Sequence, residues 1–168
     1  MSEAMVADDV LQRLAGLGLA LPAPPRPMGA YRATVTAGAM LHVAMQGPLE
    51  GGRPTHRGLV GRELSTDEGA RAARQAMLNV LAQIRARCGG FAGIRQIVRV
   101  EGYVACTDTF LDHPAVLDGA SDLLAALFGE RAGHVRLVCG VRNLPGNVPV
   151  AVALTAELSV PPLPSAER

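Results

Sequence analysis

Apolar positions recur along the chain with two different periods, and each period predicts a different kind of element. Spacings of three and four residues predict helices over residues 6–17, 65–88 and 112–128. Alternation with a period of two predicts strands near residues 31–36, 41–46 and 96–105, and two further strands over 135–141 and 148–154. The predicted order is therefore helix, strand, strand, helix, strand, helix, strand, strand.

The helix over residues 65–88 has the clearest boundaries. Ser65-Thr66-Asp67-Glu68 is a capping box, in which the Ser65 hydroxyl accepts from a first-turn N–H and Glu68 reaches back to the backbone. Gly89 follows the last helical residue, where a left-handed backbone conformation is common. Residues 47–61 hold five glycines and two prolines, so they are predicted to be a loop.

The last two strands carry an arginine in an apolar setting. Residues 133–154 are typical of a strand, a tight turn and a second strand paired with the first. Alternation places Arg136 on one face of its strand and Cys139, a predicted core residue, on the other. An unpaired buried charge costs on the order of several kcal/mol, so Arg136 needs a partner, either a protein carboxylate or a ligand.

Two amphipathic helices in this order predict an α+β fold in which both helices pack on one face of a single sheet. The other sheet face is then left bare, and a bare apolar face is normally buried by self-association. We therefore expect a homo-oligomer. Residues 1–20 are predicted to be an N-terminal helical extension, residues 21–158 the main domain and residues 159–168 a flexible tail.

Composition excludes several classes of function. The net charge is +1 and only 3% of residues are aromatic, which does not favour nucleic acid or an anionic membrane as a partner. The sequence contains no lysine, since all sixteen basic side chains are arginine. A Schiff base with a carbonyl substrate, covalently held pyridoxal phosphate and a Walker-type phosphate loop are thereby excluded.

The cysteines and the N-terminus indicate a cytoplasmic protein. Cys88, Cys106 and Cys139 are odd in number and match no metal-binding spacing, and no base for a cysteine nucleophile is evident in the sequence. The first residues lack the pattern of a signal peptide, and no apolar run reaches the ~20 residues of a membrane span. We expect reduced thiols, no metal, no cofactor and no membrane partner.

Several short motifs occur together between about residues 20 and 158. They are Gly29-Ala30-Tyr31, Gln46-Gly47-Pro48, the spacing from Arg136 to Leu144-Pro145, residues 58–65, residues 118–124 with 128–130, and Gly133-His134. In combination they resemble the RidA/YjgF family of enamine/imine deaminases, which is also described as endoribonuclease L-PSP. The segments at 58–65, 118–124, 128–130 and 133–134 resemble one longer branch of that family.

The resemblance implies a chorismate-mutase-like homotrimer whose sheets pack inward, with ligand clefts between subunits. It implies that Arg136 grips the carboxylate of a 2-imino or 2-enamino acid while water hydrolyses the C=N bond to a 2-keto acid and ammonia. Tyr31 matches a pocket tyrosine, and Gln46 ends an altered motif on the second strand. Glu101 and His134 are further candidates to contact the ligand, although Glu101 also has Arg99 and Arg136 as possible ion-pair partners. His134 lies two residues before Arg136, so alternation places both on the same strand face.

One departure from the family pattern bears on activity. Where deaminating relatives usually carry a glutamate on the last strand, this chain has Ala151, which can neither orient water nor accept a proton. Three interpretations stay open: a slow imine deaminase, a protein that binds a small carboxylate without chemistry, and a specialised pathway enzyme on the same fold with altered chemistry.

Overall fold

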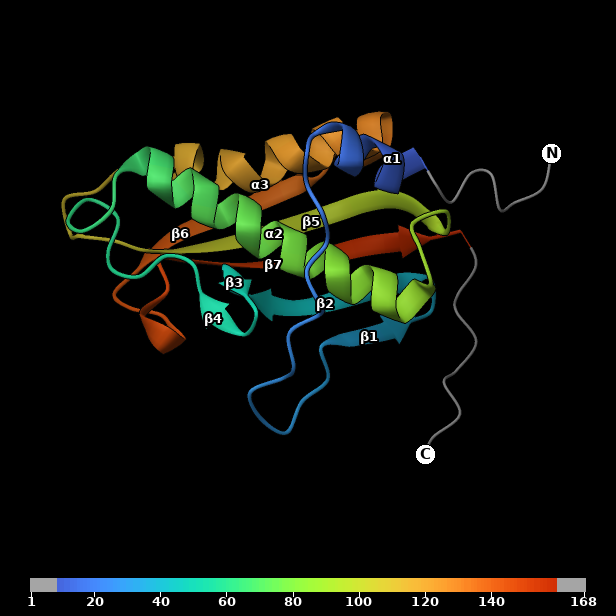
Figure 1. The fold of residues 1–168 in the computed structure, drawn as a ribbon, viewed down its shortest axis with the longest axis horizontal. Helices are drawn as coiled ribbons and strands as arrows, with labels where there is room; N and C mark the ends of the chain where they lie inside the picture. Colours follow the sequence, from blue (N-terminus) through green and yellow to red (C-terminus); the bar gives the residue numbers. More distant parts are fainter. Residues whose placement is uncertain (1–8, 160–168) are drawn as a thin grey trace.

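The computed structural model describes residues 9–159, and its main elements follow the predicted order (Figure 1). The helices are α1 Asp9–Gly16, α2 Thr66–Cys88 and α3 His113–Phe128, with short 3-10 helices η2 Gly129–Ala132 and η3 Pro145–Asn147. The strands of the main sheet are β1 Thr34–Ala37, β2 Met40–Gln46, β5 Ile94–Ala105, β6 Val135–Val141 and β7 Val150–Leu158. Residues 6–8 of the predicted first helix, and almost all of the predicted tail, lie outside the described residues.

The last two strands do not pair with each other, contrary to the prediction. The sheet order is β1-β2-β7-β5-β6, so β5 lies between β6 and β7. Strand β5 runs parallel to β6 and antiparallel to β7. Residues 142–149, which include η3, are long enough to cross the end of β5. Alternation identifies a strand but does not identify its neighbour in the sheet. Both strands were therefore predicted correctly, but their pairing as a hairpin was wrong.

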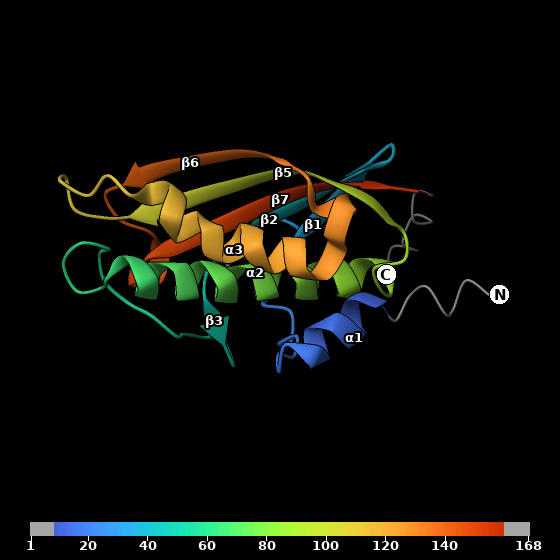
Figure 2. The same ribbon diagram turned by 90° about the horizontal axis from the view of Figure 1, so that it is seen from above.

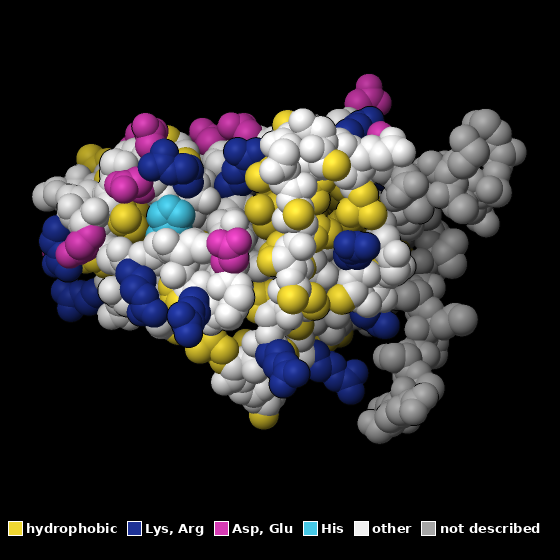
Figure 3. Space-filling view, in the orientation of Figure 1, with side chains coloured by type: hydrophobic (Ala, Val, Ile, Leu, Met, Phe, Trp, Pro, Cys, Tyr) yellow, Lys and Arg dark blue, Asp and Glu magenta, His cyan; other side chains and the backbone are white. Residues whose placement is uncertain are grey.

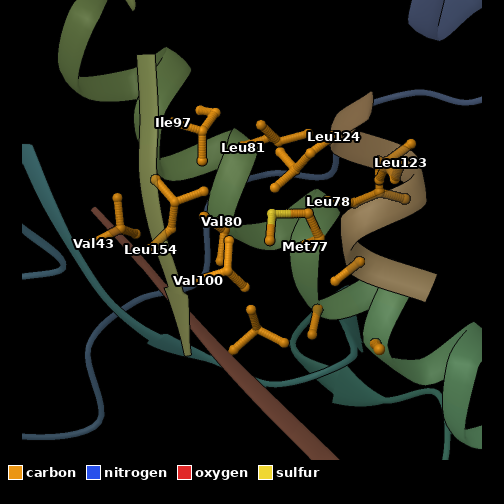
Figure 4. Packing of buried hydrophobic residues seen from close by; sticks show 14 of the residues in the cluster. Val43, Met77, Leu78, Val80, Leu81, Ile97, Val100, Leu123, Leu124 and Leu154 are labelled. Atoms are coloured by element: carbon orange, nitrogen blue, oxygen red, sulfur yellow. The ribbon is translucent and has the colours of Figure 1, made fainter. Parts of the chain in front are cut away.

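Helices α2 and α3 cover one face of the sheet, and no helix of the described residues 9–159 covers the other face (Figure 2). The core between these layers contains Met77, Val80 and Leu81 of α2, together with Leu124 of α3 and Val100 of β5 (Figure 4). This arrangement confirms the predicted α+β class and the placement of both long helices on one side.

Two glycines allow α3 to approach its neighbours closely. A side chain at Gly119 of α3 would overlap the backbone carbonyl of Ala70 in α2. A side chain at Gly102 of β5 would overlap the Leu117 side chain. The missing Cβ atoms therefore fix how close α3 lies to α2 and to the sheet.

The predicted capping box of α2 is formed. The Ser65 Oγ accepts from the Glu68 N–H at 3.2 Å, and Glu68 Oε2 accepts from the Ser65 N–H at 2.7 Å. The backbone hydrogen bond from Ser65 is the main cause that holds the pKa of Glu68 below its ordinary value. The helix ends at Gly89, whose φ is 75°.

Helix α1 packs on α3 and contributes to the core. Val10 and Leu14 are buried in the same apolar cluster as α2 and α3. Arg13 Nη1 donates to the carbonyl oxygen of Leu127, near the end of α3, at 3.1 Å. Within residues 9–159, no helix has the length and apolar composition needed to cross a membrane.

The segment predicted to be a loop contains a small hairpin. Strands β3 Leu49–Glu50 and β4 Arg53–Pro54 pair through a turn at Gly51 and Gly52, whose φ values are 56° and 78°. Both central residues have positive φ. A two-residue hairpin turn of this type requires it, because its backbone twist then matches the twist of the two strands. Asn79 of α2 holds the hairpin, because its Nδ2 donates to the carbonyl oxygen of Leu49 at 2.9 Å.

Candidate functional site

Arg136 lies on the edge strand β6 and points to the helix-covered side of the sheet. Its register partner on β5 is Val100, a core residue. From the sheet edge the guanidinium reaches α3, where Nη1 donates to Asp118 Oδ1 at 2.6 Å and to Ser121 Oγ at 3.3 Å. Asp118 and Ser121 are three residues apart and so share one side of the helix. The sequence predicted that Arg136 needs a partner but did not identify it, and in the structure a protein carboxylate, that of Asp118, fills this role.

The Asp118 pair uses only part of the guanidinium. Both hydrogen bonds come from Nη1, and within residues 9–159 the Nε and Nη2 groups of Arg136 make none. The Arg136 side chain is 26% exposed and that of Asp118 is 53% exposed. The Nε and Nη2 donors form the edge of the fork that binds a carboxylate through two parallel hydrogen bonds. Arg136 can thus hold an anion while its bond to Asp118 is kept.

His134 joins the same group of side chains, on the strand face that alternation predicted. Its Nε2 lies 3.1 Å from Ser121 Oγ, and its Nδ1 lies 2.6 Å from the carbonyl oxygen of Ala132. We call Asp118, Ser121, His134 and Arg136 the edge cluster. Sequence reasoning missed Asp118 and Ser121 as members, although both lie in a motif that was recognised beside Gly133-His134.

Glu101 lies on the uncovered face of the sheet and not in the edge cluster. It accepts from Arg99 Nε at 2.5 Å, which settles its ion-pair partner as Arg99. Tyr103 Oη is 3.5 Å from Glu101, and burial, followed by the charge of Glu101, raises the pKa of Tyr103. A shallow cavity of about 220 Å³ opens here, with His42 and Thr155 on its wall beside Arg99 and Glu101.

Ala151 and Cys139 also lie on the uncovered face. Both are register partners of Tyr103, one on each side of β5. Cys139 is half-buried and belongs to no core cluster, so its predicted core position was wrong, because the face opposite Arg136 is the uncovered one. A carboxylate at position 151 would be separated from Arg136 of the same chain by the sheet.

Gln46 and Tyr31 lie away from the edge cluster. Gln46 is buried, and its Oε1 accepts from Gln83 Nε2 of α2 at 3.4 Å. Tyr31 is 51% exposed, and its hydroxyl accepts from the Met28 N–H at 3.2 Å. Of the candidate residues chosen from the sequence, one chain therefore brings together only His134 and Arg136.

A cysteine–histidine contact was also missed by sequence reasoning. Cys106 Sγ lies 3.3 Å from His113 Nε2, and Gly140 leaves the space that both side chains occupy. Burial is the main cause that raises the pKa of the Cys106 thiol, and the charge of Asp108 adds to it. A raised pKa disfavours the thiolate, so this contact is not typical of a cysteine nucleophile. Among the described residues, no group of three or more His, Cys, Asp and Glu side chains is placed to hold a metal ion.

A groove of about 310 Å³ lies on the outer side of the helices. Its lining includes Leu17, Arg71 and Arg74, with Asp122 of α3. On the face seen in Figure 3, basic and acidic side chains are interspersed, without a continuous basic surface. The groove contains none of the candidate residues chosen from the sequence.

Comparison with known proteins gives a consistent result. The sequence model of the "YjgF/chorismate mutase-like, putative endoribonuclease" family matches residues 11–158. Protein TCP17 of Trypanosoma cruzi is 34% identical over 151 residues, which cover 89% of this chain and 94% of that protein.

Two solved structures are similar over nearly their whole length. The Agrobacterium tumefaciens protein Atu1372, of unknown function, superimposes with a TM-score of 0.87 at 33% identity, covering 94% of this chain and 96% of that one. A putative endoribonuclease from Shewanella oneidensis has a TM-score of 0.87 at 36% identity, covering 89% of this chain and 99% of that one.

Proposed function

The chain belongs to the YjgF/chorismate mutase-like family, and from that premise we propose that it binds a small 2-imino or 2-enamino acid through Arg136 and hydrolyses it to a 2-keto acid and ammonia. The observation that carries this proposal is the half-used guanidinium of Arg136 at the edge of the sheet. Its Nη1 is held by Asp118, while Nε and Nη2 are available for a carboxylate.

The chemistry of arginine supports a carboxylate as the ligand. A planar guanidinium stays protonated at any working pH and matches the two oxygens of a carboxylate. A hydrogen bond to a charged group contributes roughly 1.5–3 kcal/mol. Asp118 fixes the orientation of the guanidinium, but its own negative charge weakens the attraction for an anion. We therefore expect modest affinity and a small ligand.

Assembly as a homotrimer around the uncovered sheet face is part of the proposal. Val35, Val135 and Leu137 are partly exposed on this face, and the Arg99–Glu101 ion pair lies among them. Burial of such a face by other copies of the chain is the usual outcome. Sedimentation velocity should then give three times the 17.5 kDa mass of the chain; a monomer would contradict the assembly.

Carboxylate binding without hydrolysis is the second candidate. It is favoured by the methyl group of Ala151 where deaminating relatives usually carry a glutamate. The two candidates share the Arg136 site and differ only in turnover. Release of ammonia from 2-iminobutanoate generated in solution distinguishes them.

Isothermal titration with 2-oxobutanoate, the 2-keto acid that hydrolysis of 2-iminobutanoate would release, tests the shared part of the proposal. We expect Arg136→Met to weaken binding by about 10- to 100-fold, the loss of one charge-assisted interaction. Arg95→Met is the matched control, because Arg95 is an exposed arginine on β5 that pairs with Glu157 at 3.2 Å. Equal affinity of wild type and Arg136→Met would refute the site.

A further inference from the structure

We propose that the groove on the outer side of the helices binds a small zwitterion with an apolar body, such as an α-amino acid with a branched side chain. The groove is bordered by α2, by α3 and by Leu17, which follows α1. Its volume of about 310 Å³ lies at the lower end of the ~300–1,000 Å³ usual for small-molecule sites. This inference goes beyond the proposed function, because it needs neither Arg136 nor hydrolysis.

Small residues make the hollow between the two long helices. Helices α2 and α3 run in the same direction, and they touch where Gly119 of α3 meets the backbone of Ala70 (Figure 1). The groove lies over this contact, and Ala126 also lines it. Leu123 forms a buried part of the lining, whereas Leu17 at its end is 45% exposed. A ligand that covers Leu17 removes apolar surface from water, so the groove favours a ligand with a hydrocarbon part.

The α2 side of the groove is positively charged. Arg71 and Arg74 lie three residues apart, so they point to the same side of α2, where both line the groove. Both are exposed, and within residues 9–159 neither takes part in an ion pair. Like charges one turn apart destabilise a helix, and a carboxylate bound beside them reduces that repulsion. Arg74 has no acidic residue three or four positions away on α2, so it is the stronger of the two anion sites.

The α3 side of the groove carries a negative charge. Asp122 is three residues beyond Gly119, and Arg74 is four residues beyond Ala70, so the two charges lie at about the same level of the parallel helices. Asp122 is exposed, and no basic residue lies three or four positions from it on α3. Among the ion pairs of the described residues, none includes Asp122. The two charges therefore line one groove without pairing with each other.

Opposite charges held apart over an apolar lining are complementary to a zwitterion. The ligand carboxylate accepts from the guanidinium of Arg74, which offers two parallel N–H groups to its two oxygens. The ligand ammonium donates to the carboxylate of Asp122. A simple carboxylic acid would bring a second negative charge near Asp122, and a simple amine would bring a third positive charge near Arg71 and Arg74. The arrangement thus selects against both.

The groove is separate from the edge cluster. Successive residues of an α-helix are about 100° apart around its axis. The side of α3 that carries Gly119, Asp122 and Ala126 is therefore about a third of the helix circumference away from the side that carries Asp118 and Ser121. The two sites can be tested independently.

Isothermal titration of the full chain with four related compounds tests the proposal. L-Leucine is the probe; 4-methylpentanoate lacks its ammonium group, 3-methylbutylamine lacks its carboxylate, and glycine lacks its side chain. We expect leucine to bind at least about tenfold more tightly than each of the other three, because each of them loses one group that the groove recognises. Equal binding of 4-methylpentanoate, or no binding of leucine at about 10 mM, would overturn the proposal.

Variants show where leucine binds. Arg74→Met and Asp122→Asn should each weaken leucine binding by about tenfold or more, whereas Arg85→Met, at an exposed arginine of α2 outside the groove, should not change it. Ala126→Phe fills the groove and should abolish binding, whereas Ala86→Phe, at an exposed alanine of α2 outside the groove, should not. Full leucine affinity in Ala126→Phe would refute the site. All five positions are exposed, and circular dichroism shows whether each variant keeps the fold.

Arg136→Met separates this site from the proposed function. Its affinity for leucine should equal that of wild type, and Arg74→Met should keep the wild-type affinity for 2-oxobutanoate. If leucine binding is lost in Arg136→Met and kept in Arg74→Met, leucine binds at the edge cluster and the groove site is wrong, while the proposed function stands. If 2-oxobutanoate fails to bind and leucine binds through Arg74, the proposed function fails and the groove site stands.

Discussion

Arg136 of β6 donates through Nη1 to Asp118 Oδ1 of α3 at 2.6 Å, across the edge of the sheet. This bond gives the arginine a protein partner and leaves the other edge of its guanidinium free. It also orients the donor that holds Ser121 in line with His134. The pair therefore organises a small polar site between strand β6 and helix α3.

Replacing the charge of Asp118 should strengthen anion binding. Asp118→Asn keeps a side-chain oxygen that accepts from Arg136 but removes the negative charge beside the ligand. Half-exposed ion pairs contribute about 0.2–1 kcal/mol, so we expect 2-oxobutanoate to bind up to about fivefold more tightly in isothermal titration. The exposed Asp122→Asn variant, one helical turn away on α3, should bind as wild type does. Weaker binding of Asp118→Asn would mean that the carboxylate is needed to hold Arg136 in position.

A side chain at Gly119 should destabilise the contact between α2 and α3. The Cβ of Gly119→Ala would overlap the carbonyl oxygen of Ala70, so the two helices must separate. Overpacking of this kind costs about 1–3 kcal/mol. Gly90→Ala is the matched control, because its Cβ meets no atom within 4 Å. Urea unfolding should show a clear loss of stability for the first variant only.

The stabilising effect of Glu68 should depend on pH. Its pKa in the folded protein is held below the ordinary value of 4.5, mainly by the backbone hydrogen bond from Ser65. A carboxyl group whose pKa is lower in the folded state stabilises that state at pH values above its pKa in the unfolded chain. This contribution disappears as the pH falls through the folded-state pKa. Glu68→Ala should therefore lower Tm at pH 7, and the difference from wild type should shrink below pH 4.5. A difference in Tm that stays constant from pH 7 to pH 3 would exclude this origin; Glu130→Ala serves as an exposed control.

Helix α1 should unfold together with the rest of the chain. Leu14 is buried against the common core, and truncation of such a leucine costs about 2–5 kcal/mol. We expect Leu14→Ala to shift the single urea transition, while Leu17→Ala, at a partly exposed position, changes it by less than about 0.5 kcal/mol. A separate early transition for Leu14→Ala would show that residues 9–16 are an independent extension.

Local signals in the sequence predicted the helices and strands well. They did not predict which elements lie side by side in the fold. Ser65 and Glu68 identify the start of α2, because a capping box is formed by residues three apart. No comparable signal shows that β5 lies between β6 and β7, since alternation does not identify a strand's neighbour. The small hairpin at Gly51 and Gly52 was missed because its strands are only two residues long.

The candidate site was predicted in part for the same reason. Arg136 stands out as a charge in an apolar strand, and period-two alternation correctly places His134 on its side. Asp118 and Ser121 occupy one side of α3, but only the packing of that helix on the sheet edge brings them to Arg136. Glu101 pairs with Arg99 two residues away, an alternative that the sequence already contained.

The central claim is that Arg136 binds the carboxylate of a small ligand, and a crystal structure with 2-oxobutanoate tests it most directly. We predict both carboxylate oxygens within hydrogen-bond distance of Arg136 Nε and Nη2, with the Nη1 bond to Asp118 retained. A bound 2-oxobutanoate whose carboxylate lies beyond hydrogen-bond distance of Arg136 would contradict the account.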